Sequence, residues 1–151
     1  MANDPEHINL ILNNRRARHE YHVLESIEVG VVLRGTEVKS VRAGKINVQD
    51  AYASVEDGEL FLHNMHISPF DKGNIHNHDP LRVRKLLARK KEIRKLGQKV
   101  HEKGLTLIPL QIYFSGRHLK IEIGICKGKK TYDKRQALKK REIQRDMERQ
   151  L

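Results

Sequence analysis

The sequence predicts a mainly β protein, an OB-type antiparallel β-barrel with helices and a basic C-terminal tail. Residues 21–33 carry apolar side chains at six of seven odd positions, which indicates a long strand with one buried face. Asp57-Gly58 separates two strand-like runs, and this dipeptide is the strongest short-range signal for a β-hairpin. Residues 119–125 alternate between Leu or Ile and polar residues or glycine, which indicates a further strand.

The expected elements follow one another as strand, short helix, two strands, long helix and two strands. This is the order of an OB-type barrel, whereas an SH3-like barrel offers no natural place for the long helix. We expect residues 1–12 to be mobile, 13–126 to form the barrel and 127–151 to form the tail. The expected strands are 21–33, 47–56, 59–67, 106–114 and 119–126, and the expected helices are 37–43 and 81–103.

Three positions predict local irregularities or caps. Glu25 interrupts the apolar side of the first strand, which predicts a bend or bulge. Pro109 predicts an edge position or a bulge, because proline has no N–H to donate to a sheet. Thr36 is the expected N-cap of the short helix.

Spacing also predicts which side chains are buried. The heptad spacing of Leu86, Ile93 and Val100 predicts the long helix and places these three side chains on its buried face. The alternation along residues 59–67 places one set of side chains on the same face: Phe61, His63, Met65 and Ile67.

The positive charge is concentrated in two segments. The 151 residues carry a formal net charge of +11 and a pI of about 9.9. Residues 81–104 hold ten Lys/Arg against two Asp/Glu, and residues 127–151 hold ten against four. Such a distribution predicts a polyanionic partner, with nucleic acid ahead of an anionic membrane surface. The basic helix could instead be a solvated face, and the tail a solubilising terminus.

Catalytic, metal-binding and secretory signals are weak. The single cysteine, Cys126, cannot form an internal disulfide, and the apolar runs are too short for a signal peptide or a membrane span. The loop histidines His76 and His78 have no accompanying CxxC or HExxH pattern, and there is no phosphate-binding loop or nucleophile elbow. We therefore expect a cytoplasmic, non-enzymatic protein without a metal or cofactor.

Seven motifs stand in order along the chain. They are 14–21 (NRRARHEY), 35–45 (GTEVKSVRAGK), 65–69 (MHISP), 77–82 (NHDPLR), 84–87 (RKLL), 103–106 (KGLT) and 128–135 (GKKTYDKR). Together they resemble the small protein B family of bacteria, whose members bind transfer-messenger RNA (SsrA RNA). The resemblance implies an OB-type barrel that holds the tRNA-like domain of this RNA and enters stalled ribosomes to start trans-translation.

The resemblance also implies roles for individual residues. The RNA-binding positions would be Asn14, Arg18, His19, Glu37, Lys39, Ser40, Arg42, Asn77, Asp79, Arg82, Lys127, Lys129 and Lys130. The positions that meet the ribosomal decoding centre would be Tyr132, Asp133, Lys134 and Arg135. The rest of the tail, disordered alone, would become helical in an empty mRNA channel, and the protein would act as a monomer on the RNA.

Some alternatives remain open from the residues alone. Glu37 could accept a hydrogen bond from RNA, or it could simply complement the helix dipole in the first turn. The whole chain could be a generic RNA-binding OB protein, a metal-dependent nuclease that uses the loop histidines, or a membrane-surface protein. Sparse aromatic residues, the missing metal motifs and the narrow apolar faces of the basic helices disfavour these three, respectively.

Overall fold

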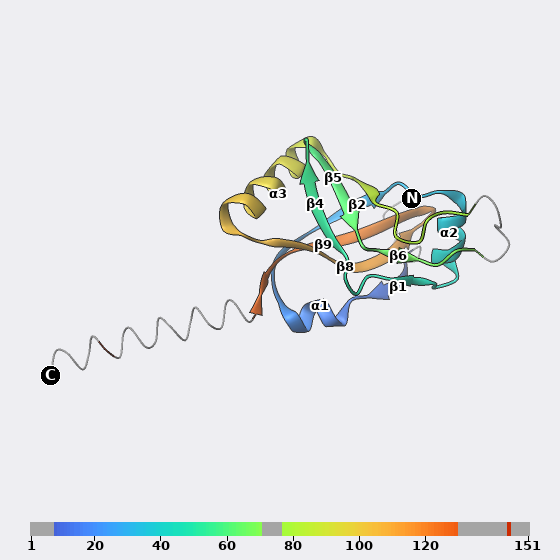
Figure 1. The fold of residues 1–151 in the computed structure, drawn as a ribbon, viewed down its shortest axis with the longest axis horizontal. Helices are drawn as coiled ribbons and strands as arrows, with labels where there is room; N and C mark the ends of the chain where they lie inside the picture. Colours follow the sequence, from blue (N-terminus) through green and yellow to red (C-terminus); the bar gives the residue numbers. More distant parts are fainter. Residues whose placement is uncertain (1–7, 71–76, 130–144, 146–151) are drawn as a thin grey trace.

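The computed structural model describes residues 8–70, 77–129 and 145, and it contains an antiparallel β-barrel with three helices in these residues (Figure 1). The mainly β class that the sequence predicts is confirmed. The elements are β1 (Ile8–Asn13), α1 (Arg15–Glu20), β2 (Tyr21–Val31), α2 (Gly35–Arg42), β3 (Ile46–Asn47), β4 (Tyr52–Glu56), β5 (Glu59–His63), β6 (His66–Ile67), β7 (Arg84–Leu87), α3 (Lys90–Lys103), β8 (Thr106–Ser115) and β9 (His118–Gly128).

Six strands close the barrel. The order β8-β4-β5-β7-β2-β9 returns to β8, because β8 and β9 are also paired, and β1 adds to the free part of β8. The Asp57-Gly58 hairpin is confirmed, with φ of 51° and 76° at the two turn residues. Both predicted bulges are confirmed as well: the register shifts between Val23 and Glu25, and again just after Pro109.

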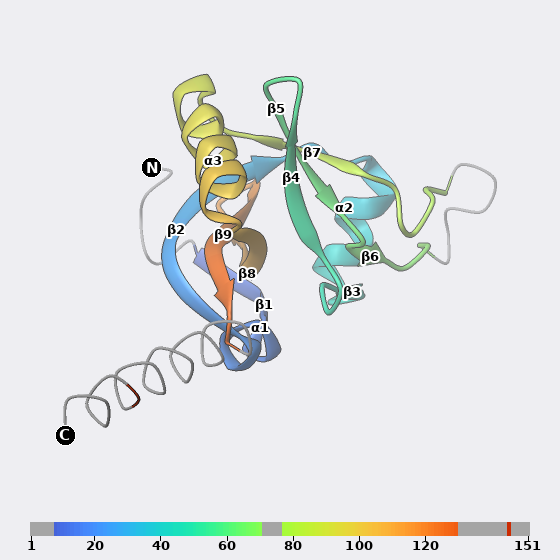
Figure 2. The ribbon, with the colours of Figure 1, turned by 60° about the vertical axis from the view of Figure 1, so that its left-hand side comes forward.

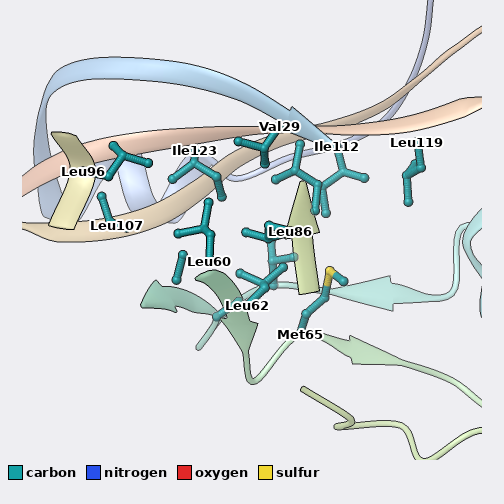
Figure 3. Packing of buried hydrophobic residues seen from close by; sticks show 14 of the residues in the cluster. Val29, Leu60, Leu62, Met65, Leu86, Leu96, Leu107, Ile112, Leu119 and Ile123 are labelled. Carbon is teal, nitrogen blue, oxygen red and sulfur yellow. The ribbon is translucent and has the colours of Figure 1, made fainter. Parts of the chain in front are cut away.

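The core fills the barrel interior (Figure 3). Leu119, Ile121, Ile123 and Ile125 of β9 all belong to it, as their alternation predicts. Burial of large aliphatic side chains removes apolar surface from water at roughly 25 cal/mol per Å² and is the main force that closes the sheet. A smaller cluster lies outside this core, between α1 and the strands β8 and β9, and consists of Ala17, Ile108, Leu110 and Cys126.

The prediction of one helix over residues 81–103 is wrong in its first part. Residues 84–87 form β7, which pairs with β5 and β2, and the helix α3 begins only at Lys90. In β7 the side chains alternate, with Arg84 and Leu86 buried and Lys85 and Leu87 exposed. The heptad spacing is misleading because Leu86 and Ile93 belong to the same core but to different elements. Leu86 enters this core from the strand β7, and Ile93 enters it from the helix α3.

The predicted face of the strand over residues 59–67 is also wrong. Leu60 and Leu62 are buried in β5, whereas Phe61 and His63 are half-buried. Asn64 has a φ of 60°, and this left-handed residue shifts the alternation by one position. Met65 and Ile67 are therefore fully buried, as predicted, but Met65 lies in the link after β5 and Ile67 belongs to the separate strand β6.

The first and last elements of the barrel begin and end at residues other than those expected from the sequence. Residues 8–12, expected to be mobile, belong to β1 and pair with β8, and residues 1–7 lie outside the described residues. The basic run after Asn14 forms the helix α1, which the predicted element order lacks. The last strand continues past Cys126 to Gly128 and includes Lys127, because Tyr21 and His22 of β2 pair with Gly128 and Lys127.

Candidate nucleic-acid interface

Glu37 is the buried anchor of the helix α2. Its Oε1 accepts hydrogen bonds from the backbone N–H of Arg34 (2.8 Å) and from Nη2 of Arg82 (2.5 Å), and its Oε2 accepts one from Nε of Arg84 (2.7 Å). Because Glu37 reaches back to Arg34, the N-cap is Arg34 and not the expected Thr36. Burial alone would raise the pKa of Glu37, but these hydrogen bonds outweigh burial and hold the pKa below its usual value.

Arg84 joins four segments of the chain through one guanidinium group. It is fully buried at the start of β7 and donates to Glu37, to the carbonyl oxygen of Met65 and to that of Pro80 (3.1 Å). A buried cation is stable only with such partners, since both charges have been taken out of water. The network therefore fixes α2 relative to the turn that precedes β7.

The burial of Glu37 bears on its two interpretations. Neither carboxylate oxygen faces solvent, because the side chain is fully buried. This geometry favours a structural role, in which Glu37 holds Arg82 and Arg84, and direct contact with RNA stays a prediction. Ser40 on the next turn of α2 is equally buried.

Charged and polar side chains surround this buried network and form what we name the α2 surface: Lys39, Arg42 and Asp79, which are exposed, and Asn77 and Arg82, which are half-buried. The ammonium of Lys39 lies 5.3 Å from the ring centre of Phe70, and the guanidinium of Arg42 lies 4.7 Å from that of Phe114. These contacts hold both side chains at the surface of α2, where their charges can meet phosphate oxygens.

The turn before β7 completes the α2 surface. The side-chain amide of Asn77 donates to the carbonyl oxygen of Phe70 (2.7 Å) and accepts from its N–H (2.9 Å). The carboxylate of Asp79 accepts from the N–H of Leu81 (3.0 Å), which closes the turn. The buried ring of His78 hydrogen-bonds to Thr36 and to the carbonyl oxygen of Ile67. Asn77 and Asp79 thus shape the turn.

A second group of predicted residues forms what we name the α1 surface: Arg18, His19, Lys127 and Lys129. Arg18 and His19 are exposed at the end of α1, and the pairing of Tyr21 with Gly128 brings the end of β9 beside them. His19 and Lys129 line one shallow hollow. Strand pairing therefore brings Arg18 and His19 together with Lys127 and Lys129, two pairs that are distant in the sequence.

Asn14 belongs to this end of the barrel but has a structural role. Its side chain is the N-cap of α1, accepting from the N–H of Ala17 (3.1 Å) and donating to the carbonyl oxygen of Pro109 (2.9 Å). It is buried, with 8% of its surface exposed. Asn14 thereby orients α1, and with it Arg18, on the barrel.

The α1 and α2 surfaces lie at opposite ends of β2. This strand has 11 residues and so spans roughly 35 Å at about 3.3 Å per residue. Figure 2 shows α1 at the lower end of the barrel and α2 on its right side. The structure thus divides the predicted RNA-binding residues into two groups instead of one site. Lys130 and the predicted decoding-centre residues Tyr132, Asp133, Lys134 and Arg135 lie outside the described residues.

Comparison with known proteins gives the family. The family model described as SmpB protein matches residues 11–151. The chain belongs to the SmpB family. It is 54% identical over 142 residues to the SsrA-binding protein of Carboxydothermus hydrogenoformans (94% of this chain, 95% of the relative) and 53% identical over 149 residues to that of Desulforudis audaxviator (99% and 96%).

A solved structure supports the same relationship. It is described as "tmRNA-SmpB: a journey to the center of the bacterial ribosome", and it is 52% identical with a TM-score of 0.68. The similarity covers 80% of this chain and 85% of the other. The small protein B family suggested by the sequence motifs is therefore confirmed.

One surface feature of this SmpB-family chain escaped the sequence reasoning. A shallow hollow beside α2 combines apolar residues with cations, and Val38, Leu87, Phe114, Arg117 and Lys120 are among the residues that line it. Leu87 is 51% exposed, and its side chain packs against Gly30 of the neighbouring strand. The exposure of Leu87 could have been predicted from the sequence only if residues 84–87 had been recognised as a strand.

Other chemistries receive no support from the described residues. Among residues 8–70, 77–129 and 145, no group of three or more His, Cys, Asp or Glu side chains could hold a metal ion. Cys126 is fully buried, and burial raises the pKa of its thiol to about 11, which disfavours the reactive thiolate. Within that part of the chain, no helix has the length and apolar character that a membrane crossing requires.

Proposed function

We propose that this chain binds the tRNA-like domain of SsrA RNA and delivers it to stalled ribosomes, where the pair enables trans-translation. The observation that carries the proposal is membership of the SmpB family over residues 11–151. Relatives that match 94% or more of this chain are named SsrA-binding proteins. The related solved structure unites tmRNA, SmpB and the bacterial ribosome in its description.

The geometry supports binding to a folded RNA. The α1 and α2 surfaces present cations on rigid elements, with Arg18 on a capped helix and Arg82 held by Glu37. Contacts of this kind follow the phosphate backbone and set the register of an RNA. We infer that Arg18, His19, Lys39, Arg42, Arg82, Lys127, Lys129 and Lys130 contact the RNA directly, whereas Asn14, Glu37, Asn77 and Asp79 hold these contacts in place. The hydroxyl of Ser40 is buried and makes no hydrogen bond within the described residues, so this side chain lacks such a supporting contact.

The tail has a separate proposed role. Tyr132, Asp133, Lys134 and Arg135 are proposed to meet the decoding centre, with the following residues in the empty mRNA channel. The chain would act as a monomeric binding protein in the cytoplasm, where ribosomes are, and not as an enzyme.

Filter binding tests the function directly. The purified chain should retain SsrA RNA at concentrations at which an unstructured RNA of equal length is not retained. The RNA should stay intact with and without a chelator, which separates a binding protein from a metal-dependent nuclease. Equal retention of both RNAs would reduce the protein to a generic RNA-binding barrel, and cleavage that a chelator stops would replace the proposal.

A matched pair of variants tests the α1 surface. Arg18→Gln with Lys129→Gln should weaken SsrA RNA binding, because two phosphate contacts are lost. Arg16→Gln with Lys85→Gln is the control, because it removes the same charge from residues already paired with Glu20 (2.9 Å) and Glu59 (3.1 Å). Equal effects of the two changes would show that only the total charge matters.

A further inference from the structure

The helix α3 carries more positive charge than the barrel neutralises. It contains six lysines and arginines against two glutamates. Its buried side, with Ile93 and Leu96, packs on the core, and Gly97 lies against Val55 of β4. Lys91, Arg94 and Lys95 are exposed on consecutive turns and form what we name the α3 face.

Two acids near α3, Glu25 and Glu92, are already engaged with cations, and Glu102 lies in the last turn of the helix, beyond the α3 face. Glu25, at the bulge of β2, hydrogen-bonds to Lys99, and its pKa is held below the usual value first by Lys99 and then by Lys95 and Lys103. Glu92 lies 3.8 Å from Arg89. Among the described residues, no carboxylate lies within 4.0 Å of the charged groups of Lys91 or Arg94.

The placement of this charge does not favour the helix itself. Lys90 and Lys91 occupy the first turn of α3, where the positive end of the helix dipole repels cations; Glu92 is the acid in this turn, and no side chain caps this end. Arg94 and Lys95 lie three and four residues after Lys91, so each of them also repels Lys91. Folding alone would favour acidic residues at these positions, and a polyanion would relieve the repulsion.

The helix α3 lies apart from α1 and α2, which carry the surfaces already described. In Figures 1 and 2, α3 lies on the opposite side of the barrel from α1 and away from α2. An RNA held against the α1 and α2 surfaces therefore leaves the α3 face open. Lys91 and Arg94 differ in this from Lys99, whose ammonium is directed to Glu25.

We propose that the α3 face, through Lys91, Arg94 and Lys95, binds the phosphate backbone of ribosomal RNA when the protein enters the ribosome with SsrA RNA. This inference rests on the proposed function, because the ribosome is the second polyanion that such a complex meets. The contact is with phosphate oxygens and is independent of base sequence. It gives the folded barrel, and not only the tail, a role in the affinity for ribosomes.

Sedimentation of a preformed protein–SsrA RNA complex with purified ribosomes tests the inference. The double change Lys91→Gln with Arg94→Gln should weaken ribosome binding by about tenfold and make it less dependent on salt, because two phosphate contacts are lost. Its affinity for SsrA RNA in filter binding should change less than about twofold. Its melting temperature should not fall, because like-charge repulsion in α3 is reduced.

The control is Arg16→Gln with Lys85→Gln, which removes the same charge from residues already paired with Glu20 and Glu59. Unchanged ribosome binding in the α3 variant would overturn the inference, as would an equal loss in the control. A parallel loss of SsrA RNA affinity would assign the α3 face to that RNA instead. If the unaltered chain does not bind SsrA RNA, the proposed function fails, and sedimentation of the free protein with ribosomes still tests the α3 face.

Discussion

Glu37 and Arg84 form a fully buried ion pair, 2.7 Å apart, between the first turn of α2 and the start of β7. They are 47 residues apart in the sequence. The pair holds Arg82 at the α2 surface, because Arg82 shares the carboxylate of Glu37 with Arg84. The acid at position 37 thus orients Arg82, a cation of the α2 surface.

Replacing Glu37 should destabilise the fold. Glu37→Ala leaves Arg84 buried without its counter-ion, which costs about 3–5 kcal/mol in the free energy of unfolding. Glu37→Gln should cost less, because the amide oxygen still accepts hydrogen bonds. Urea denaturation measures both values.

The same variants separate the two interpretations of Glu37. At a temperature where Glu37→Gln is folded, its affinity for SsrA RNA should fall because Arg82 is less firmly held. The opposite result would be that both variants melt at the same temperature as the unaltered protein but bind RNA more weakly. That result would favour direct contact between the Glu37 carboxylate and RNA.

The ion pair should also make stability depend on acid pH. The pKa of Glu37 is lower in the folded protein than in the unfolded chain, so the unfolded state binds the extra proton more readily. The contribution of Glu37 is fully present above the unfolded pKa of about 4.3 and is lost as the pH falls through the folded pKa. Urea denaturation between about pH 3 and pH 7 should show that the free energy of unfolding falls less steeply with decreasing pH in Glu37→Gln than in the unaltered protein.

Gly124 should not tolerate a side chain. A Cβ at this position would lie 2.7 Å from Cδ1 of Leu110, which is buried and cannot move aside. Gly124→Ala should therefore destabilise the protein by about 1–3 kcal/mol through overpacking. Gly35→Ala is the control, because nothing lies within 4 Å of a Cβ there, and it should be neutral or slightly stabilising. Similar denaturation midpoints for the two variants would contradict this packing.

Deletion of residues 134–151 should separate the two activities of the protein. The α1 and α2 surfaces remain in the truncated chain, so affinity for SsrA RNA should change little. Tagging of peptides on stalled ribosomes should be abolished, because the proposed sensor of the empty channel is gone. Equal losses in filter binding and in the tagging assay would show that the tail is part of the SsrA RNA site.

Local patterns in the sequence predict much of the barrel correctly. The alternation in β9, the turn at Asp57-Gly58 and the irregularities at Glu25 and Pro109 are properties of short segments, and the structure contains each of them. Alternation fails where one residue changes the phase, as the left-handed Asn64 does in the strand that follows Glu59. It also fails for β7, whose four residues are too few to show a period.

The sequence predicts the candidate site less completely than the fold, because the charge of a residue does not show whether its side chain is buried or exposed. The motifs mark Glu37, Asn77 and Asp79 as important, but their hydrogen bonds make them supports for neighbouring groups. Arg84 stands in a basic segment and reads as one more surface cation, yet it is fully buried. Its environment depends on α2, which is distant in sequence.

The sequence by itself determined the β-rich class, the two basic segments and the resemblance to the small protein B family, since these depend on composition and on motifs in linear order. Only the tertiary structure decided which cations are exposed and where they gather. Pairing of β2 with β9 brings Lys127 and Lys129 beside Arg18, and the buried pair of Glu37 and Arg84 sets the position of Arg82. These relations depend on strand pairing and desolvation between distant segments, which a linear pattern does not encode.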